Sequence, residues 1–238
     1  MISGFVQILA FTLVFFAVIR VSLNACLAIP ELNNVDAALA RFMELSPTCS
    51  DTVDICVPIV LYVTQDQDGF SQTPEWFADQ LRVAQTHFAL INIGFQLYKV
   101  VQLPEETTRN GIVKTKDDRD RLGEGGRYNK GVIAVFLVHE LHDVDKPGVI
   151  RGVHWRHRSR PEQRWVIVSK IAPFLVLAHE LGHFFGLPHS KETGSLMNKT
   201  PRELPPSTQW TFTAKEQKHM RGTVKAMLRS GIVKQVDR

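Results

Sequence analysis

The sequence predicts an α+β domain with a buried sheet. Four apolar, β-branched runs have the length of strands, at residues 57–63, 95–101, 132–138 and 165–168. Between the first two runs, apolar residues recur every three or four positions, which predicts a long amphipathic helix. Two further helices are predicted toward the C-terminal end, and one of them carries closely spaced histidines.

Length and composition place the chain among ordinary globular proteins. Its 238 residues fit one domain, or one domain with a small appendage. The net charge of +4 is modest, with 44% apolar and 22% charged residues. Basic and aromatic residues do not interleave as in nucleic-acid-binding proteins, so we expect no nucleic-acid partner.

The first 28 residues read as a targeting segment. The uncharged run Phe5–Ile19 has the size of a signal-peptide core and is short for a membrane span. Cleavage after Ala28 would release a secreted chain. Leu23–Cys26 resembles a bacterial lipobox, so lipidation of Cys26 and an uncleaved membrane anchor are the alternatives. We expect a secreted, periplasmic or cell-envelope protein, with a lipoprotein as one form of it.

Export would affect the oxidation state of the remaining cysteines, Cys49 and Cys56. An oxidising compartment permits a disulfide that closes a small loop before the first strand, and free thiols are the alternative. Residues 29–50 predict a short helical segment, because Val35, Leu39 and Phe42 recur at helical spacing. The main domain is then residues 51–238.

The long helix has a predicted start and end. Thr73 is a candidate N-cap with Pro74 in the first helical position, and the apolar stripe runs to about Asn92 before Gly94. His87 lies on this stripe and is expected to be packed in the core.

The middle of the chain alternates polar and apolar segments. Residues 104–130 are rich in charge and glycine and predict a solvated loop, with a calcium site as an alternative. The run 132–138 is the most apolar and is expected at the centre of the sheet. Residues 139–164 are rich in His and Arg, which predicts an exposed edge strand near 149–155 with a basic loop, or arginines that recognise an anionic substrate.

The motif that carries chemistry is His179-Glu180-Leu181-Gly182-His183-Phe184-Phe185-Gly186-Leu187-Pro188-His189. On a helix, His179 and His183 are about 6 Å and roughly 40° apart, so both imidazoles leave one face and can share a Zn²⁺ ion. Gly186 is expected to end the helix, so that His189 returns as the third ligand. Three protein ligands leave a fourth position open for water, as in catalytic zinc sites. Glu180 then suits the role of general base.

We expect this helix to begin near Ser169, with Pro173 in its first turn and Phe174 among its buried residues. Beyond it, Pro201, Pro205 and Pro206 predict an extended loop at a specificity pocket. Thr213–Glu216 has the pattern of a capping box, which predicts a last helix to about Leu228 with His219 on its surface.

The motif resembles the zinc signature of the metzincin metallopeptidases, and Ser195-Leu196-Met197-Asn198 resembles their Met-turn. Met197 lies eight positions after His189, and Ser190 follows His189 directly. Both details are similar to the matrixin branch. The proline that usually follows the matrixin methionine is missing, and Lys199 stands where an astacin-type tyrosine ligand would be. The resemblance implies a twisted, mostly parallel sheet with an antiparallel edge strand, a long backing helix, an active-site helix, a Met-turn and a C-terminal helix.

The resemblance also implies a function for residues 51–238 as a catalytic domain. It implies a zinc-dependent endopeptidase with His179, His183 and His189 as ligands, Glu180 as general base on a metal-activated water, and Gly186 and Met197 as structural support. The expected partner is a protein or peptide, the expected cofactor is one catalytic Zn²⁺, and the expected state is a monomer. A second zinc bound by residues of 139–164, and a Cys49 latch on the catalytic zinc, are further matrixin-like alternatives.

Two other functions fit the same motif. One is an exported zinc-binding module without turnover. The other is an exported zinc amidase that acts on cell-wall amides, because the same chemistry would serve that bond.

Overall fold

The sheet has five strands in the order β4-β1-β6-β9-β8. In this computed structural model, residues 34–200 and 205–236 are described, so the predicted targeting segment and Pro201 lie outside the described residues. Strands β4, β1, β6 and β9 are parallel, and β8 pairs antiparallel with β9 at the edge. The predicted α+β class, the central position of the 132–138 run and the antiparallel edge strand are confirmed. The strands are β1 (Ile55–Val63), β4 (Ile93–Gln102), β6 (Ile133–Val138), β8 (Gly152–His157) and β9 (Arg160–Ser169).

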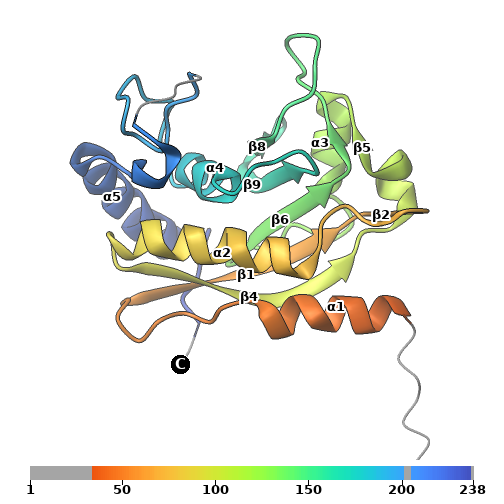
Figure 1. Cartoon of the computed structure of the whole chain (residues 1–238), viewed down its shortest axis with the longest axis horizontal. Coiled ribbons are helices and arrows are strands. Elements are labelled where there is room, and N and C mark those ends of the chain that lie inside the picture. Colours follow the sequence, from red (N-terminus) through yellow and green to blue (C-terminus); the bar gives the residue numbers. More distant parts are fainter. Residues whose placement is uncertain (1–33, 201–204, 237–238) are drawn as a thin grey trace, which may run out of the picture. The chain divides into compact units, whose positions relative to one another are not determined.

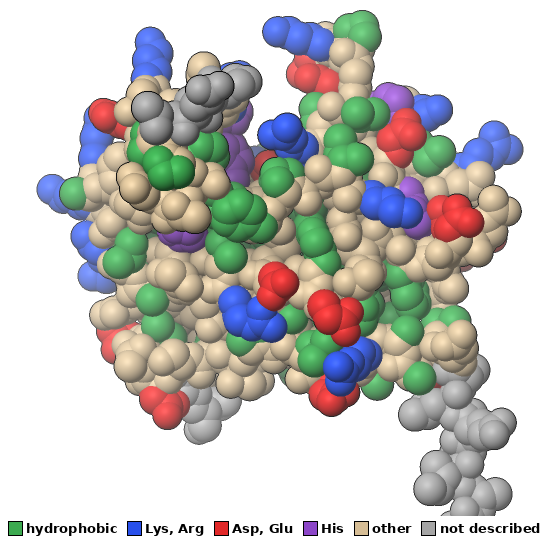
Figure 2. All heavy atoms as spheres, viewed as in Figure 1, with side chains coloured by type: hydrophobic (Ala, Val, Ile, Leu, Met, Phe, Trp, Pro, Cys, Tyr) green, Lys and Arg blue, Asp and Glu red, His purple; other side chains and the backbone are tan. Residues whose placement is uncertain are grey.

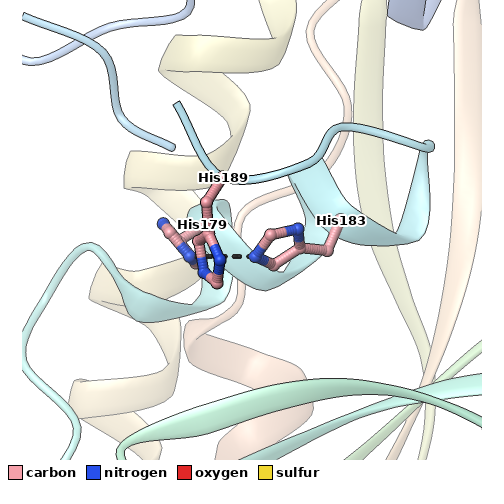
Figure 3. Close-up of side chains that lie close together, drawn as sticks. All are labelled: His179, His183 and His189. Atoms are coloured by element: carbon pink, nitrogen blue, oxygen red, sulfur yellow. Dashed lines mark hydrogen bonds between the residues drawn. The ribbon is translucent and has the colours of Figure 1, made fainter. Parts of the chain in front are cut away.

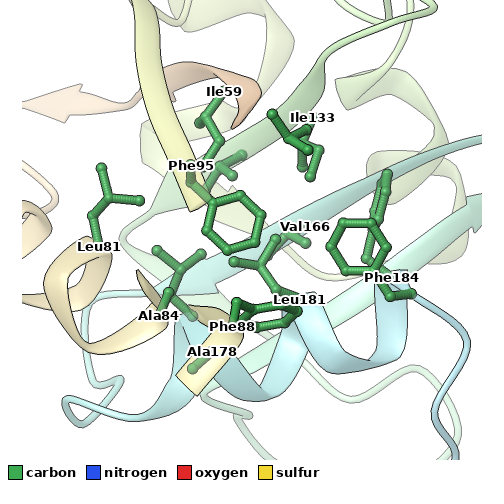
Figure 4. Close-up of a cluster of buried hydrophobic side chains, with 14 of the residues drawn as sticks. Ile59, Leu81, Ala84, Phe88, Phe95, Ile133, Val166, Ala178, Leu181 and Phe184 are labelled. Atoms are coloured by element: carbon green, nitrogen blue, oxygen red, sulfur yellow. The ribbon is translucent and has the colours of Figure 1, made fainter. Parts of the chain in front are cut away.

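Helices cover both faces of this sheet within residues 37–238 (Figure 1). On one face, α2 (Pro74–Ala89), α4 (Val176–Phe184) and α5 (Ala214–Ser230) close over the main core. Alternate strand residues such as Ile59 and Val166 point into it, and Figure 4 shows them packed with Phe88 of α2 and Leu181 of α4. This packing holds α4 against the sheet.

The long helix α2 starts as predicted and ends earlier. Thr73 accepts a hydrogen bond from the backbone N–H of Trp76, and Pro74 is the first helical residue. The helix stops at Ala89, and Asn92 has a positive φ of 62°. The turn into β4 therefore comes before Gly94. His87 is half-buried against the ring of Phe212, as expected of a packed residue.

The prediction of a solvated loop at 104–130 is wrong. The segment contains α3 (Lys116–Leu122), which begins with a capping box between Thr115 and Asp118. It buries Arg119, Asp120 and Leu122 on the second face of the sheet. The polar composition of the segment did not indicate a packed helix, because two of its three buried side chains, Arg119 and Asp120, are charged and find their hydrogen-bond partners only in the folded chain. Short elements flank it: β5 (Ile112–Val113), η1 (Glu105–Thr107) and η2 (Arg109–Gly111).

The active-site helix begins later than predicted. Strand β9 runs from Arg160 to Ser169, so it starts five residues before the apolar run, and α4 begins only at Val176. Pro173 precedes the helix and accepts a hydrogen bond from the N–H of Val176. Phe174 was expected to be buried, but it is 45% exposed because it lies before the helix.

The last helix and the N-terminal helix follow the predictions closely. Helix α5 starts with the capping box of Thr213 and Glu216 and ends at Gly231 in the left-handed conformation, and His219 is exposed. Helix α1 (Asn34–Leu45) lies within the predicted N-terminal segment, and its Phe42 is fully buried. The boundary at residues 50–51 stays a prediction. Two short strand pairs complete the fold, β2 (Gln65–Asp66) with β3 (Gly69–Phe70) and β7 (Glu140–Leu141) with β5. A short 3-10 helix, η3 (Ser207–Gln209), precedes α5.

Cys49 and Cys56 form a disulfide that ties the segment after α1 to β1. The bond contradicts both the free-thiol and the zinc-latch alternatives, because neither sulfur is left to bind a metal. None of the helices in the described ranges has the length and apolar character needed to cross a bilayer.

Candidate metal centre

Three histidines converge at the open side of α4. His179 and His183 leave the same face of α4, and His189 reaches them from the segment beyond the helix (Figure 3). One ring nitrogen of each lies within 4.8 Å of the other two, and among the described residues this is the group with metal-ligand spacing. The structure therefore brings together the three histidines that the motif predicts.

A glycine turn returns the chain to the first two histidines. Gly186 has φ of 92°, a conformation that favours glycine. The turn is closed by a hydrogen bond of 3.0 Å from the N–H of Leu187 to the carbonyl of Gly182. His189 follows two residues later, so the end of the helix itself positions the third ring.

Hydrogen bonds set the protonation of two rings. His179 Nδ1 lies 2.8 Å from the carbonyl oxygen of Leu196, and His183 Nδ1 lies 2.6 Å from that of Leu187. A carbonyl only accepts, so each Nδ1 must carry the proton, and in the neutral rings each Nε2 presents a lone pair.

The two Nε2 atoms face one another at 3.1 Å. Two lone pairs at this distance repel, unless a cation lies between them. Nitrogens that bind one tetrahedral Zn²⁺ at about 2.0–2.1 Å are themselves about 3.3 Å apart. The donor atoms and their spacing therefore fit zinc.

The three rings are held in the neutral form that a metal requires. The pKa of His183 is lowered to about 4, mainly by burial and also by the neighbouring His179 and His189, against the effect of the Leu187 hydrogen bond. Burial also lowers the pKa of His179 and of His189. Neutral imidazoles can bind a metal ion without first losing a proton.

Glu180 lies beside the triad on the side that faces β8. It is 6% exposed, and burial raises its pKa to about 8, while a hydrogen bond from the backbone N–H of His154 and the charge of Arg119 act in the opposite direction. A Cβ at Gly152 would lie 3.0 Å from Glu180 Cγ. Gly152 therefore leaves the room that this carboxylate occupies, and sequence reasoning had not singled it out.

Met197 lies in a tight turn behind α4. It is fully buried, and a Cβ at Gly182 would lie 2.5 Å from its Sδ. The N–H of Met197 donates to Ser195 Oγ, which itself donates to Glu216 of α5. The preceding carbonyl, of Leu196, is the acceptor for His179, so the turn and the triad are directly connected.

A cavity of about 940 Å³ opens in front of these groups. Its walls are the segment from Val149 to Arg156, the side of α4 and the turn around Met197. Figure 2 shows the molecule hollowed near the top of this view, with histidine side chains on one wall and Lys or Arg side chains at the mouth. Pro205 and Pro206 are outside the residues that line it.

The residues suggested for a second zinc do not gather. His142 pairs with Glu140, and His157 bonds to Arg160, while His154 points to the other side of β8, toward Phe184. Asp143 and Asp145 sit in a turn in which Asp145 pairs with Lys116. Within the described ranges, these groups do not form a metal-ligand cluster.

The family-model match agrees with the motif. Residues 131–220, which include all three histidines and Met197, match the family model of the matrixins. Archaemetzincin from Methanopyrus kandleri is a similar solved structure, at 16% identity and a TM-score of 0.48, over 74% of this chain and 97% of that one. Metalloproteinase-II from Bacteroides fragilis is similar at 13% identity and a TM-score of 0.46, over 75% of this chain and 55% of that one. No curated protein sequence matches the chain.

The matrixin match and the assembled triad together support a metzincin-like zinc metallopeptidase. They support zinc-dependent peptide hydrolysis in general, and hence a protein or peptide substrate.

Proposed function

We propose that the chain is an exported endopeptidase that holds one catalytic Zn²⁺ through His179, His183 and His189 and uses Glu180 as general base. The observation that carries this proposal is the convergence of three neutral imidazoles beside a buried carboxylate at the floor of a large cavity. Zn²⁺ bound there supplies Lewis acidity toward water and a carbonyl oxygen, and its charge favours the ionised form of Glu180.

Glu180 is placed to move a proton. Its ionised carboxylate takes the proton of a water molecule in the cavity as that water attacks the peptide carbonyl, and passes it to the leaving amine. The N–H of His154 holds the carboxylate in place. Because Glu180 is enclosed by α4 and β8, bulk water does not compete for it.

Strand β8 is placed to align the peptide. Among the described strands its one partner is β9, and its residues Gly152, Val153 and His154 line the cavity. An extended substrate can therefore add to this edge by main-chain hydrogen bonds, with its backbone crossing in front of Glu180.

The test is Glu180→Gln in the purified mature protein. The amide cannot accept the proton, so we expect cleavage of a quenched peptide to fall by about 10²-fold or more. Zinc content by mass spectrometry should stay near one ion per chain, whereas His189→Ala should lose the metal. Glu162→Gln, an exposed position on β9, is the matched control.

Wild-type cleavage by Glu180→Gln would contradict the general-base role. Metal-loaded wild type that binds zinc and cleaves no peptide would favour the non-hydrolytic module, and release of amines from cell-wall fragments alone would favour the amidase. Native mass spectrometry of the same sample measures the expected monomer. Export is supported by the disulfide between Cys49 and Cys56, because such bonds persist in oxidising compartments.

A further inference from the structure

The wall of the cavity has an excess of positive charge. Arg151, Arg156 and Lys199 line it, against the carboxylates of Asp143 and Glu180. Among the described residues, none of these three cations takes part in an ion pair. Cations in a concave, low-dielectric wall concentrate anions from solution.

Two arginines lie side by side near the end of β8. Arg156 lies directly opposite Arg164 of β9 in the strand register. Like charges in this position destabilise a sheet, and Arg164 is also only 9% exposed. Glu162, on the same strand, forms no ion pair with either arginine in the described structure.

Two polar atoms in this region also lack partners. Arg164 Nε and His154 Nε2 are buried without a hydrogen bond in the described structure. Both side chains belong to the same face of the β8–β9 pair as Arg156, because His154 pairs with Val166 in register. Burial lowers the pKa of Arg164, and the charge of Arg156 lowers it further. An anion next to Arg156 would relieve this repulsion.

The position of Arg156 relates it to the reacting bond. Two positions of β8 meet Glu180: a Cβ at Gly152 would lie 3.0 Å from its Cγ, and the N–H of His154 donates to its carboxylate. Arg156 is two to four residues farther along the strand, which is roughly 7–13 Å at about 3.3 Å per residue. A carboxylate two to four residues from the cleaved bond would reach the arginine.

We propose that the cavity selects peptides carrying a carboxylate two to four residues from the cleaved bond, with Arg156 as its partner and Arg164 behind it. This inference rests on the proposed peptidase function. The carboxylate has two sources: an acidic side chain within a longer peptide, or the terminal carboxylate of a peptide that ends there.

The experiment compares matched quenched peptides. Starting from a neutral peptide that wild type cleaves, Glu, Gln or Lys is placed at each position in turn, with an amidated or a free C-terminus. We expect one position at which Glu raises kcat/KM about tenfold over Gln, with Lys below both. A rise that appears only with a free C-terminus at that distance assigns the terminal carboxylate as the source.

Variants then assign the effect. Arg156→Glu should reverse the order of the Glu and Lys peptides, and Arg156→Gln should make them equal. Lys225→Glu changes the charge by the same amount on an exposed position of α5 and should keep the wild-type order. Peptide binding to Glu180→Gln protein, followed by fluorescence anisotropy, should show the same preference without turnover.

Equal cleavage of the Glu, Gln and Lys peptides at every position would overturn the inference and leave the peptidase proposal intact. If wild type cleaves none of the peptides, that result contradicts the peptidase proposal instead. The anisotropy measurement then decides whether the cavity prefers a carboxylate. A preference for Glu that survives in Arg156→Glu would also overturn the assignment.

Discussion

Residues that neither bind the metal nor react help to position the metal ligands. Gly182 occupies a variable position of the motif, between Glu180 and His183. In this chain it is the point at which the buried Met197 contacts α4. The same turn supplies the Leu196 carbonyl that orients His179, so the packing at Gly182 is transmitted to a ligand.

We therefore predict that Gly182→Ala is destabilising, although alanine is the better helix former. The added methyl group would meet Met197 Sδ at 2.5 Å and Phe212 at 3.1 Å. We expect a loss of about 1–3 kcal/mol in the free energy of unfolding, together with weaker zinc binding. Urea unfolding and a zinc competition titration measure the two effects.

Gly222→Ala on α5 is the control, because a methyl group there meets nothing within 4 Å. It should leave zinc affinity unchanged and increase stability slightly. Wild-type zinc affinity and stability in Gly182→Ala would show that the turn is not coupled to the triad.

At the scale of elements, a buried carboxylate of α3 holds the helix to the edge strand, and the exposed Asp117 adds an ion pair with Arg158. Asp120 accepts hydrogen bonds from Trp155 Nε1 at 2.7 Å and from Arg158 Nε at 2.6 Å, and it is buried. Arg119, beside it on α3, lies over the ring of Trp155 at 4.9 Å. Helix α3 thus supports the strand on which the substrate is proposed to bind.

Asp120→Asn should lower the stability at neutral pH by about 2–4 kcal/mol, because buried donors lose a charged acceptor. Burial alone would raise the pKa of Asp120, but the hydrogen bonds from Trp155 and Arg158 outweigh it and lower the pKa below 3.8. The unfolded chain therefore takes up the proton at a higher pH than the folded one. The stability contributed by Asp120 is present above about pH 4 and is lost as the pH falls through the folded pKa.

Urea unfolding of wild type and Asp120→Asn from pH 7 to pH 3 checks this prediction. The difference between them should shrink below about pH 4. Asp51→Asn, at an exposed position, should differ little from wild type throughout. A difference that stays constant into the acid range would mean that the charge of Asp120 is not what stabilises the contact.

At the scale of the whole molecule, the three histidines connect segments that are separate in sequence. Two ligands lie on α4, which packs on the sheet, and the third lies on the segment that leads to the Met197 turn and α5. An ion at this junction would stabilise the folded chain alone, since the unfolded chain holds no preformed triad.

Removal of the metal with phenanthroline should therefore lower the melting temperature. Free zinc at 100 times its Kd contributes about 2.7 kcal/mol, which corresponds to a shift of roughly 5–10 °C for a chain of this size. His189→Ala should melt at the same temperature with and without the chelator, and His87→Ala should keep the shift. An equal shift in His189→Ala would place the stabilising ion elsewhere.

The sequence by itself determined the elements and chemistry that depend on neighbours along the chain. Helix periodicity, the caps at Thr73 and Thr213 and the spacing of the three histidines are local, because one helix and the turn after it set where those side chains point. Element boundaries were less certain. Strand β9 and helix α4 both begin where tertiary hydrogen bonds, rather than apolar content, allow them to.

Only the tertiary structure decided which distant residues meet. The burial of Asp120 in α3, the room that Gly152 leaves for Glu180 and the pairing of Arg156 with Arg164 all depend on strand register and on helix docking. A shift of one residue in register would turn each strand residue to the other face of the sheet. Composition does not reveal that register, so the juxtaposition of Arg156 and Arg164 beside the cavity becomes apparent only when β8 is paired with β9.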